Sequence, residues 1–348
     1  MRHAALIAIA AAGCVPHLGP ARVRYGTPEV LPLVQPSTDA RRWYLPMETD
    51  VLGPVVWFVD TGYTYTTCDD DLAAALGLEL HGLVRIRGEL GRVRAEKAVL
   101  PTMELGGHEI DRVVCQVRDL GSTSSLDDPD EVPIAGVLGM DVLRQFRLRF
   151  DPASGTVELD RPGDRPPLRW SDEGVVRLRR AGVRGLRARV PLEVQGQRVW
   201  PILDTGATNT YVDGGPLGLE PTYVLENVTV RGTGLGGSQI RRLLSYELDG
   251  VRVGGQALPT VTLIDRDRGW WEPGLLGLDL LSHFVQDYDF AHGRMQLIPT
   301  APEPLPQFSS WWPPEDPPAA RIRGGPVLAT RPVGPSTDVS ADSEITLP

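Results

Sequence analysis

The sequence predicts an all-β protein built from two duplicated lobes. The chain has 348 residues, of which 41% are hydrophobic and 23% are charged, a globular composition long enough for about two domains. Its 38 glycines and 32 prolines, against 6% aromatic residues, favour short strands separated by turns over long helices. A set of motifs that occurs twice in the same order indicates that one unit has been duplicated.

The first fourteen residues are typical of a secretion signal. A short positive stretch (1–3) precedes an apolar run (4–12) that is too short to cross a bilayer as a helix. The run ends in small residues before Cys14, which resembles the lipobox of bacterial lipoproteins, where the cysteine thiol is acylated. Ala11 departs from that motif, which usually has Leu, so an ordinary signal peptide or a chance apolar start stays open.

The lipobox resemblance also implies a location. Cys14 would become the acylated N-terminus, and Val15 after it is not the Asp that usually retains lipoproteins at the inner membrane. We therefore expect a lipid-anchored protein of the cell envelope that faces the periplasm, with residues 15–38 as a tether. We expect no other contact with a membrane.

Two Asp-Thr-Gly sequences anchor the duplication. They begin at Asp60 and Asp204, and each follows an apolar run. An apolar-apolar-Gly sequence closes each unit, ending at Gly139 in the first and at Gly277 in the second, and a glycine lies 28 residues after each aspartate. These offsets predict an N-terminal lobe over 39–163 and a C-terminal lobe over 164–300.

Local patterns inside the two units predict strands with a few short helices. Runs with β-branched residues bounded by Gly or Pro predict strands over 84–94, 112–117, 228–231 and 258–263. Three aspartates at 69–71 predict the N-terminus of a short helix, because acidic residues there complement the helix dipole. We expect a second short helix after each apolar-apolar-Gly sequence, starting at Asp141 and at Asp279.

Two segments lack these patterns. Residues 161–189 carry nine arginines and several prolines, which we interpret as a linker that leads into the first strand of the second lobe. The net charge of -10 leaves no basic field across the protein, so we expect no nucleic-acid partner. Residues 301–348 carry eleven prolines without apolar periodicity, which predicts a disordered tail.

The paired aspartates suggest a chemistry. A carboxylate at the end of an apolar strand is desolvated, which raises its pKa. Duplicated lobes can bring two such groups together across a pseudo-two-fold axis. Two carboxylates a few ångströms apart do not both ionise near neutrality, so they share a proton. Such a pair can take a proton from water and give one to a carbonyl oxygen.

Taken together, these motifs resemble the retropepsin-like aspartic proteases, in the bacterial form with two lobes fused in one chain, over residues 40–300. The resemblance implies two β-barrel lobes with a cleft between them and Asp60 and Asp204 as catalytic residues. The positions that match the family's support of the dyad are Thr61, Gly62, Thr205 and Gly206. Those that match the two flaps over the substrate are Gly88, Gly91, Gly232, Gly234 and Gly236.

The chain departs from the family pattern after the first Asp-Thr-Gly. Ala207 follows the second copy, as the family expects, but Tyr63 follows the first. The Tyr63 ring would distort the dyad, point outward or cap one end of the cleft, and these alternatives stay open. Neither position carries a Ser or Thr whose hydroxyl could stabilise the ionised dyad, so we expect an activity optimum nearer neutral than strongly acidic.

Some further residues carry weaker expectations. Tyr63, Ala207 and Trp271 are candidates for a substrate pocket, with simple packing as the alternative for the tryptophan. Cys68 and Cys115 either form a disulfide or remain two buried thiols. The six histidines show no metal-ligand spacing, so we expect no metal and no cofactor.

These observations favour an aspartic endopeptidase that acts on polypeptides as a monomer with pseudo-dimeric lobes. The alternative is a catalytically impaired peptide-binding or scaffold protein of the envelope on the same fold. Two other interpretations rank lower: lobes that pair between two chains, and Asp-Thr-Gly turns that lie far apart and are only structural.

Overall fold

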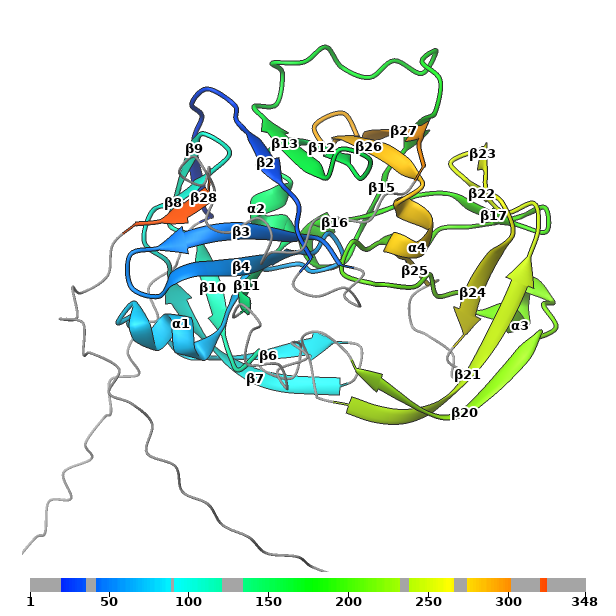
Figure 1. The fold of residues 1–348 in the computed structure, drawn as a ribbon, viewed down its shortest axis with the longest axis horizontal. Helices are drawn as coiled ribbons and strands as arrows, with labels where there is room; N and C mark the ends of the chain where they lie inside the picture. The colour runs from blue at the N-terminus through cyan, green and yellow to red at the C-terminus, as the bar shows by residue number, and fades with distance from the viewer. Residues whose placement is uncertain are drawn as a thin grey trace, which may run out of the picture.

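The computed structural model describes residues 20–35, 42–88, 91–120, 134–231, 238–265, 274–301 and 320–323. Strands dominate this part of the chain, and its α-helices are short, so the predicted all-β class is confirmed (Figure 1). The helices are α1 (Asp70–Ala75), α2 (Met140–Leu143), α3 (Gly214–Leu217) and α4 (Leu278–Leu281), with a 3-10 turn, η2, over Val183–Gly185. The described residues contain no helix that is both long and apolar enough to cross a membrane.

An 11-stranded sheet forms most of the first half. Its strands, in spatial order, are β1 (Arg22–Arg24), β9 (His108–Asp111), β8 (Met103–Leu105), β28 (Ala320–Ile322), β3 (Tyr44–Thr49), β4 (Gly53–Val59), β11 (Ile134–Leu138), β5 (Thr67–Cys68), β10 (Val114–Val117), β7 (Gly91–Val99) and β6 (Leu83–Gly88). Cys68 and Cys115 form a disulfide with their Cα atoms 5.7 Å apart, which ties β5 to β10. The helix predicted at the three aspartates is α1. Asp69 caps its N-terminus by accepting a hydrogen bond from the backbone N–H of Asp71.

Smaller sheets form the second half. One contains β15 (Arg179–Ala181), β16 (Arg187–Arg189), β19 (Ile202–Leu203) and β25 (Leu275–Leu276). A second contains β18 (Gln197–Val199), β17 (Leu192–Val194), β22 (Arg252–Val253) and β23 (Gln256–Ala257), and a third β20 (Tyr223–Arg231), β21 (Ser238–Leu248) and β24 (Val261–Asp265). The helices α2 and α4 begin directly after the two apolar-apolar-Gly sequences, as predicted.

A six-stranded sheet joins the two halves. Its order is β14 (Val175–Arg177), β27 (Arg294–Pro299), β26 (Phe284–Asp289), β12 (Arg147–Asp151), β13 (Thr156–Asp160) and β2 (Val30–Pro32). The junction is the antiparallel pair β12–β26, in which Phe150 lies opposite Gln286. Behind it, Phe150 stacks on Trp43 with ring centroids 5.0 Å apart and meets the edge of Tyr288 at 5.7 Å. The halves therefore share one apolar core.

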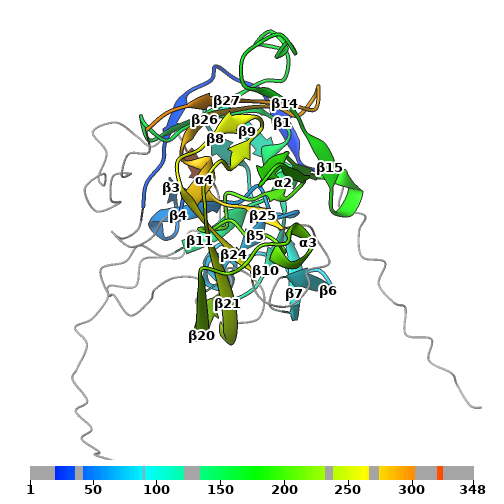
Figure 2. The ribbon, with the colours of Figure 1, turned by 90° about the vertical axis from the view of Figure 1, so that its right-hand side faces the viewer.

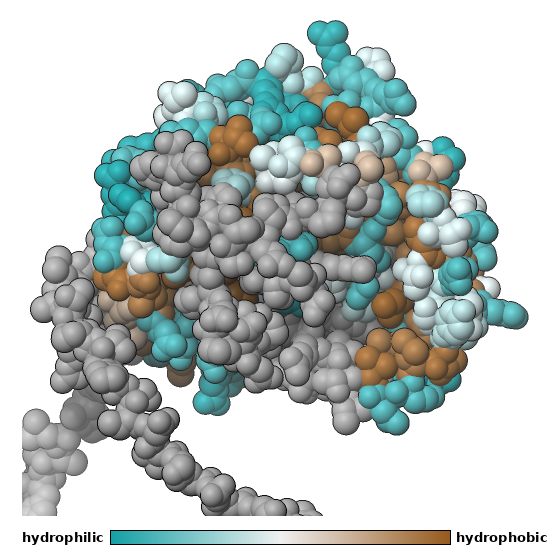
Figure 3. All heavy atoms as spheres, viewed as in Figure 1, coloured by the Kyte–Doolittle hydropathy of each residue, from teal (hydrophilic) through white to brown (hydrophobic). Residues whose placement is uncertain are grey.

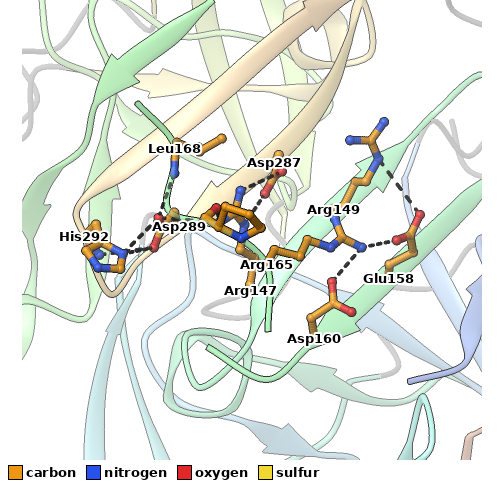
Figure 4. Close-up of polar contacts among 10 residues, drawn as sticks. Arg147, Arg149, Glu158, Asp160, Arg165, Leu168, Asp287, Asp289 and His292 are labelled. Carbon is orange, nitrogen blue, oxygen red and sulfur yellow. Dashed lines mark hydrogen bonds and ion pairs between the residues drawn. The ribbon is translucent and has the colours of Figure 1, made fainter. Parts of the chain in front are cut away.

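A buried ion pair crosses the same junction (Figure 4). The Arg147 guanidinium on β12 donates to both carboxylate oxygens of Asp287 on β26, at 2.8 and 3.0 Å, and lies 3.6 Å from Asp289. Asp289 also accepts a hydrogen bond from Nδ1 of the His292 ring at 2.9 Å. Removing one partner would leave a buried charge uncompensated and would lower the free energy of unfolding by about 3–5 kcal/mol. The two halves are thus joined by charge as well as by backbone pairing.

Three expectations about the termini and the linker are wrong in part. Residues 22–24 and 30–32 of the expected tether form β1 and β2, which pair with β9 and β13. The expected linker contains β14, β15 and β16. In the expected disordered tail, β28 lies between β3 and β8. Each strand has only three residues, too short for an alternating pattern to stand out beside prolines and arginines.

Two long hairpins extend from the halves on the side away from the six-stranded sheet, β6–β7 from the first and β20–β21 from the second (Figures 1 and 2). The second hairpin carries exposed apolar side chains on β20, namely Tyr223, Val224 and Leu225. Figure 3 shows an apolar patch at its lower right, where this hairpin lies in Figure 1. Paired hairpins on one side are the arrangement expected of two flaps.

Candidate active site

The two Asp-Thr-Gly turns occupy equivalent places in the two halves. Asp60 follows β4, which pairs in parallel with β11, and Asp204 follows β19, which pairs in parallel with β25. The backbone N–H of Asp60 donates to the Leu138 carbonyl at 3.1 Å, and that of Asp204 donates to the Leu276 carbonyl at 3.0 Å. Each aspartate is therefore fixed where two short parallel strands end, and the apolar-apolar-Gly sequences supply the second strand.

The two carboxyl groups face each other. Within each turn, the glycine N–H donates to an oxygen of its own aspartate, Gly62 to Asp60 at 2.8 Å and Gly206 to Asp204 at 2.9 Å. A Cβ on Gly62 would collide with the Asp204 carboxyl group, and a Cβ on Gly206 would collide with that of Asp60. Only glycine fits at either position, because the opposite carboxyl group occupies the space of a side chain.

The two threonines of these turns hold the halves together through a reciprocal set of buried hydrogen bonds. The Thr61 hydroxyl accepts the Thr205 N–H and the Thr205 hydroxyl accepts the Thr61 N–H, both at 3.0 Å. Each hydroxyl donates to the other half, Thr61 to the Leu203 carbonyl at 3.1 Å and Thr205 to the Val59 carbonyl at 2.7 Å. The hydroxyl and the backbone N–H of each threonine are satisfied across the interface, which positions both aspartates relative to each other.

The two aspartates differ in how strongly they hold a proton. Burial, the neighbouring Asp204 charge and a hydrogen bond between the two carboxyl groups raise the pKa of Asp60 well above its ordinary value. Burial also raises the pKa of Asp204, but the hydrogen bond to Asp60, the Gly206 N–H and the Arg187 charge act against that rise. Asp60 is 6% exposed, whereas Asp204 is partly exposed. The two carboxyl groups therefore share one proton, and the Arg187 charge and the greater exposure of Asp204 favour the ionised form on that side.

Arg187 is a site residue that the sequence analysis missed. It lies on β16, in the segment we expected to be a linker, and its Nη1 donates to the Gly62 carbonyl at 3.5 Å. Its positive charge lowers the pKa of Asp204. No motif singles it out among nine arginines, because only the pairing of β16 with β15 and β19 carries it to the turns.

A second pair of polar links, also missed, supports the turns from behind. Thr66 donates its N–H and its hydroxyl to Asp141 at 2.8 and 2.9 Å, and Thr210 donates the same two groups to Asp279 at 2.8 and 2.7 Å. Burial raises the pKa of each of these carboxyl groups to about 6. In both copies the threonine lies six residues after the aspartate of Asp-Thr-Gly, and the linked aspartate lies two residues after the glycine of the apolar-apolar-Gly sequence. This repeated spacing is the sequence signal that could have identified the two links.

Tyr63 does not distort the first turn. Its N–H donates to the Asp60 carbonyl at 3.3 Å and its carbonyl accepts the Met140 N–H at 2.9 Å. Ala207 makes the equivalent bonds in the second turn, at 3.2 and 2.8 Å. The Tyr63 ring packs against an apolar cluster of the first half that includes Phe58 and Val137. The ring is directed into its own half, which differs from all three alternatives expected for this residue.

The flap and pocket candidates are described only in part. Gly88 ends β6 and pairs with Gly91, which begins β7. Ala207 packs beside Ile202 and Leu275. The other predicted positions, Gly232, Gly234, Gly236, Trp271 and Cys14, lie outside the described residues.

Among the described residues, one acidic group has a spacing that could suit a metal ion. Asp69, Asp70 and Asp119 each place a carboxylate oxygen within 4.8 Å of the others. Asp69 already accepts the N–H groups of Asp71 and Leu120. This group is separate from the dyad, whose own neighbours are hydrogen-bond donors and an arginine.

Comparisons with known proteins agree with the motifs in the first half. The protein-family model described as aspartyl protease matches residues 49–142, which include the first Asp-Thr-Gly turn and the first apolar-apolar-Gly sequence. The match confirms the resemblance to the retropepsin-like aspartic proteases. It ends before the second turn, whose place beside the first comes from the contacts described above. No curated protein matches the chain.

Two solved structures are similar to this chain at low identity. A retropepsin-like aspartic protease from Rickettsia conorii is 20% identical, covers 39% of this chain and 100% of its own, and has a TM-score of 0.28. The structure of a protein named edgp is 11% identical, covers 80% of this chain and 96% of its own, and has a TM-score of 0.46. Both TM-scores lie below 0.5, so neither structure by itself assigns an activity to this chain.

Proposed function

We propose that the protein is an aspartic endopeptidase, in which Asp60 and Asp204 together activate the water that hydrolyses a peptide bond. One observation carries the proposal: two buried carboxyl groups on equivalent turns share a hydrogen bond and are locked together by reciprocal threonine contacts. An aspartyl-protease match over the first turn supports the same chemistry.

The unequal environments of the two aspartates assign their roles. The ionised Asp204 carboxylate takes a proton from water while the water oxygen bonds to the scissile carbonyl carbon. The protonated Asp60 carboxyl gives its proton to the carbonyl oxygen, which produces a neutral tetrahedral diol. When the carbon–nitrogen bond breaks, Asp204 returns its proton to the leaving amine and Asp60 recovers one from the diol. No covalent enzyme intermediate forms, and the dyad ends with one proton, as it began.

The proposed substrate is a polypeptide held beneath the hairpins β6–β7 and β20–β21. Flap-like hairpins exclude water from a cleft and strengthen the electrostatic interactions inside it. The binding-protein alternative rested on Tyr63 and on the altered first flap, which together would disable catalysis. The Tyr63 backbone instead repeats the hydrogen bonds of Ala207, which removes the first of these two grounds.

The test is cleavage of a diverse peptide mixture, read by mass spectrometry across pH. The protein should keep residues 320–322, because β28 belongs to the large sheet. Asp60→Asn and Asp204→Asn should each reduce cleavage about 10²–10⁴-fold, because both carboxyl groups transfer protons in the same step. Cleavage that persists in either folded variant, or none at any pH from the folded wild type, would overturn the proposal.

The pH dependence of cleavage provides a second test. Burial raises the pKa of both dyad carboxyl groups, and no Ser or Thr follows either glycine to oppose that rise. The singly protonated dyad therefore persists toward neutral pH, where we expect the maximal rate. A rate that peaks below about pH 4 would contradict this assignment.

We also propose that the protein is exported and lipid-anchored through Cys14, facing the periplasm as a monomer. The Cys68–Cys115 disulfide supports an oxidising compartment. Fractionation of cells that express the wild type and Cys14→Ser tests the anchor: the wild type should enter the membrane fraction and the variant should not. Size-exclusion chromatography of the active fraction tests the monomer.

A further inference from the structure

A cavity lined by arginines lies beside the active-site turns. Its volume is about 200 Å³, room for several waters at about 30 Å³ each and therefore for a small ion. The wall includes the end of α2, the β15–η2–β16 hairpin and the turn between β26 and β27. Its basic side chains are Arg144, Arg179, Arg180, Arg187 and His292. Among the described residues, no Asp or Glu contributes to the wall.

Two of the positive charges in this wall are held in place by neutral groups. The Arg144 Nη1 donates to the Gly185 carbonyl at 2.8 Å, and the Arg179 guanidinium stacks 3.5 Å from the centroid of the Trp200 ring. Within the described part of the chain, Arg144, Arg179 and Arg180 have no carboxylate partner. Burial and the Arg180 charge lower the pKa of Arg144, so these like charges repel each other. In an acidic protein, a cluster of like positive charges indicates a binding site for an anion.

His292 shows that the cavity is preorganised. Its Nδ1 lies 2.9 Å from the Asp289 carboxylate, which in turn lies 3.6 Å from Arg147 (Figure 4). That contact assigns the Nδ1 proton to Asp289 and leaves the other ring nitrogen, Nε2, for a ligand or solvent. The histidine is therefore oriented by the ion-pair network that joins the two halves.

Arg187 connects the cavity to the dyad. Its side chain lines the cavity, and its Nη1 reaches the Gly62 carbonyl at 3.5 Å. The groups near the Asp204 carboxyl include the Asp60 carboxyl, the Arg187 guanidinium, Tyr211 and the backbone N–H groups of Gly206 and Ala207. Arg187 is thus a cation that lies between the cavity and the charged member of the dyad.

We propose that this cavity binds a phosphate-type oxyanion, and that the bound anion and Asp204 interact through Arg187. Guanidinium groups offer paired donors that match the oxygens of phosphate, and four arginines line this cavity. The anion and the Asp204 carboxylate then compete for the same cation. Anion binding therefore favours the neutral form of Asp204, and a neutral Asp204 favours anion binding by the same factor.

Binding is measured by calorimetric titration of the full chain with inorganic phosphate at constant ionic strength. We expect saturable binding to one site, weakened about tenfold or more in Arg180→Gln, because a charge-assisted hydrogen bond is lost. Arg144→Gln provides a second variant in the same wall. Arg22→Gln removes an equal charge from exposed β1 and should leave binding unchanged. No saturable binding, or equal weakening by Arg22→Gln, would overturn the site.

A phosphate monoester distinguishes the source of the anion. Glycerol phosphate in place of inorganic phosphate should bind at least as tightly if the natural ligand carries an esterified phosphate, and more weakly if it is the free ion. Either result keeps the site. Acetate that binds as tightly as phosphate would overturn the assignment to a phosphate-type anion.

The link to the dyad has a test that does not depend on peptidase activity. Asp204→Asn resembles the neutral carboxyl, so at pH 8 it should bind phosphate about fivefold more tightly than the wild type. Equal affinity would overturn the coupling while leaving the site intact. A failure to cleave peptides would overturn the proposed function and leave both binding results unaffected.

Discussion

The two halves of the molecule agree closely at the dyad and differ around it. Each places an aspartate after a short parallel pair of strands, with a glycine donor, a threonine that crosses to the other half and a buried threonine–aspartate link behind. Among the described residues, only the first half has a disulfide, and only the second brings an arginine to the dyad. The reacting groups follow the duplication, whereas stability and electrostatic tuning are specific to each half.

The largest expected effect tests whether the two halves are equivalent at the dyad. Gly62→Ala and Gly206→Ala should each reduce peptide cleavage about 10²-fold or more, because the new methyl group displaces the opposite carboxyl group, and misplacement by about 1 Å has that effect. Steady-state cleavage of one peptide measures both. Gly215→Ala in α3, where a Cβ meets only ordinary contacts, is the control and should retain activity. A large loss in one variant alone would show that the turns are not equivalent.

Removal of the disulfide tests the difference in stabilisation between the two halves. Replacing both Cys68 and Cys115 with Ala should lower the free energy of unfolding by about 2–4 kcal/mol, because the bond closes a long loop in the unfolded chain. Urea unfolding with and without a reductant measures this change. The reductant should destabilise the wild type by a similar amount and leave the double variant unchanged. A wild type that is insensitive to reductant would contradict the assigned bond.

The buried threonine–aspartate links behind the turns make the stability of the fold depend on pH. The carboxyl groups of Asp141 and Asp279 have folded pKa values of about 6 against an ordinary 3.8, so the folded state binds protons more tightly than the unfolded chain. Stability should therefore rise as pH falls from 7 toward 4, by up to about 3 kcal/mol per group. Urea unfolding at several pH values measures it.

Asn variants separate the two links. Asp141→Asn and Asp279→Asn should each remove that group's share of the pH dependence. Asp141 accepts all its recorded donors on Oδ1, which an amide oxygen replaces, whereas Asp279 uses both oxygens. We therefore expect Asp279→Asn to be the less stable variant at pH 4. An unchanged pH dependence in both variants would show that other groups titrate.

The smallest expected effect concerns Tyr63. Tyr63→Phe should change cleavage less than about twofold, because the ring packs into its own half and the backbone makes the contacts to the turn. Cleavage and thermal unfolding of the variant should be compared with the wild type. A tenfold loss of rate without loss of stability would return Tyr63 to the active site.

The sequence by itself determined the all-β class, the duplication and the pair of aspartates. Apolar runs, glycines and Asp-Thr-Gly sequences are local patterns that repeat at equal offsets, so they can be read without a structure. The short helices after Asp69, Gly139 and Gly277 are local in the same sense, since a capping position or a tight turn initiates each.

Only the tertiary structure decided which distant residues meet. Three-residue strands such as β28 are ordered by the neighbours that they pair with, and their own sequence carries too little pattern to show it. Arg187 became part of the site because β16 packs beside the turns, and the disulfide became definite because β5 and β10 lie side by side. These contacts depend on long-range packing, which no local spacing encodes.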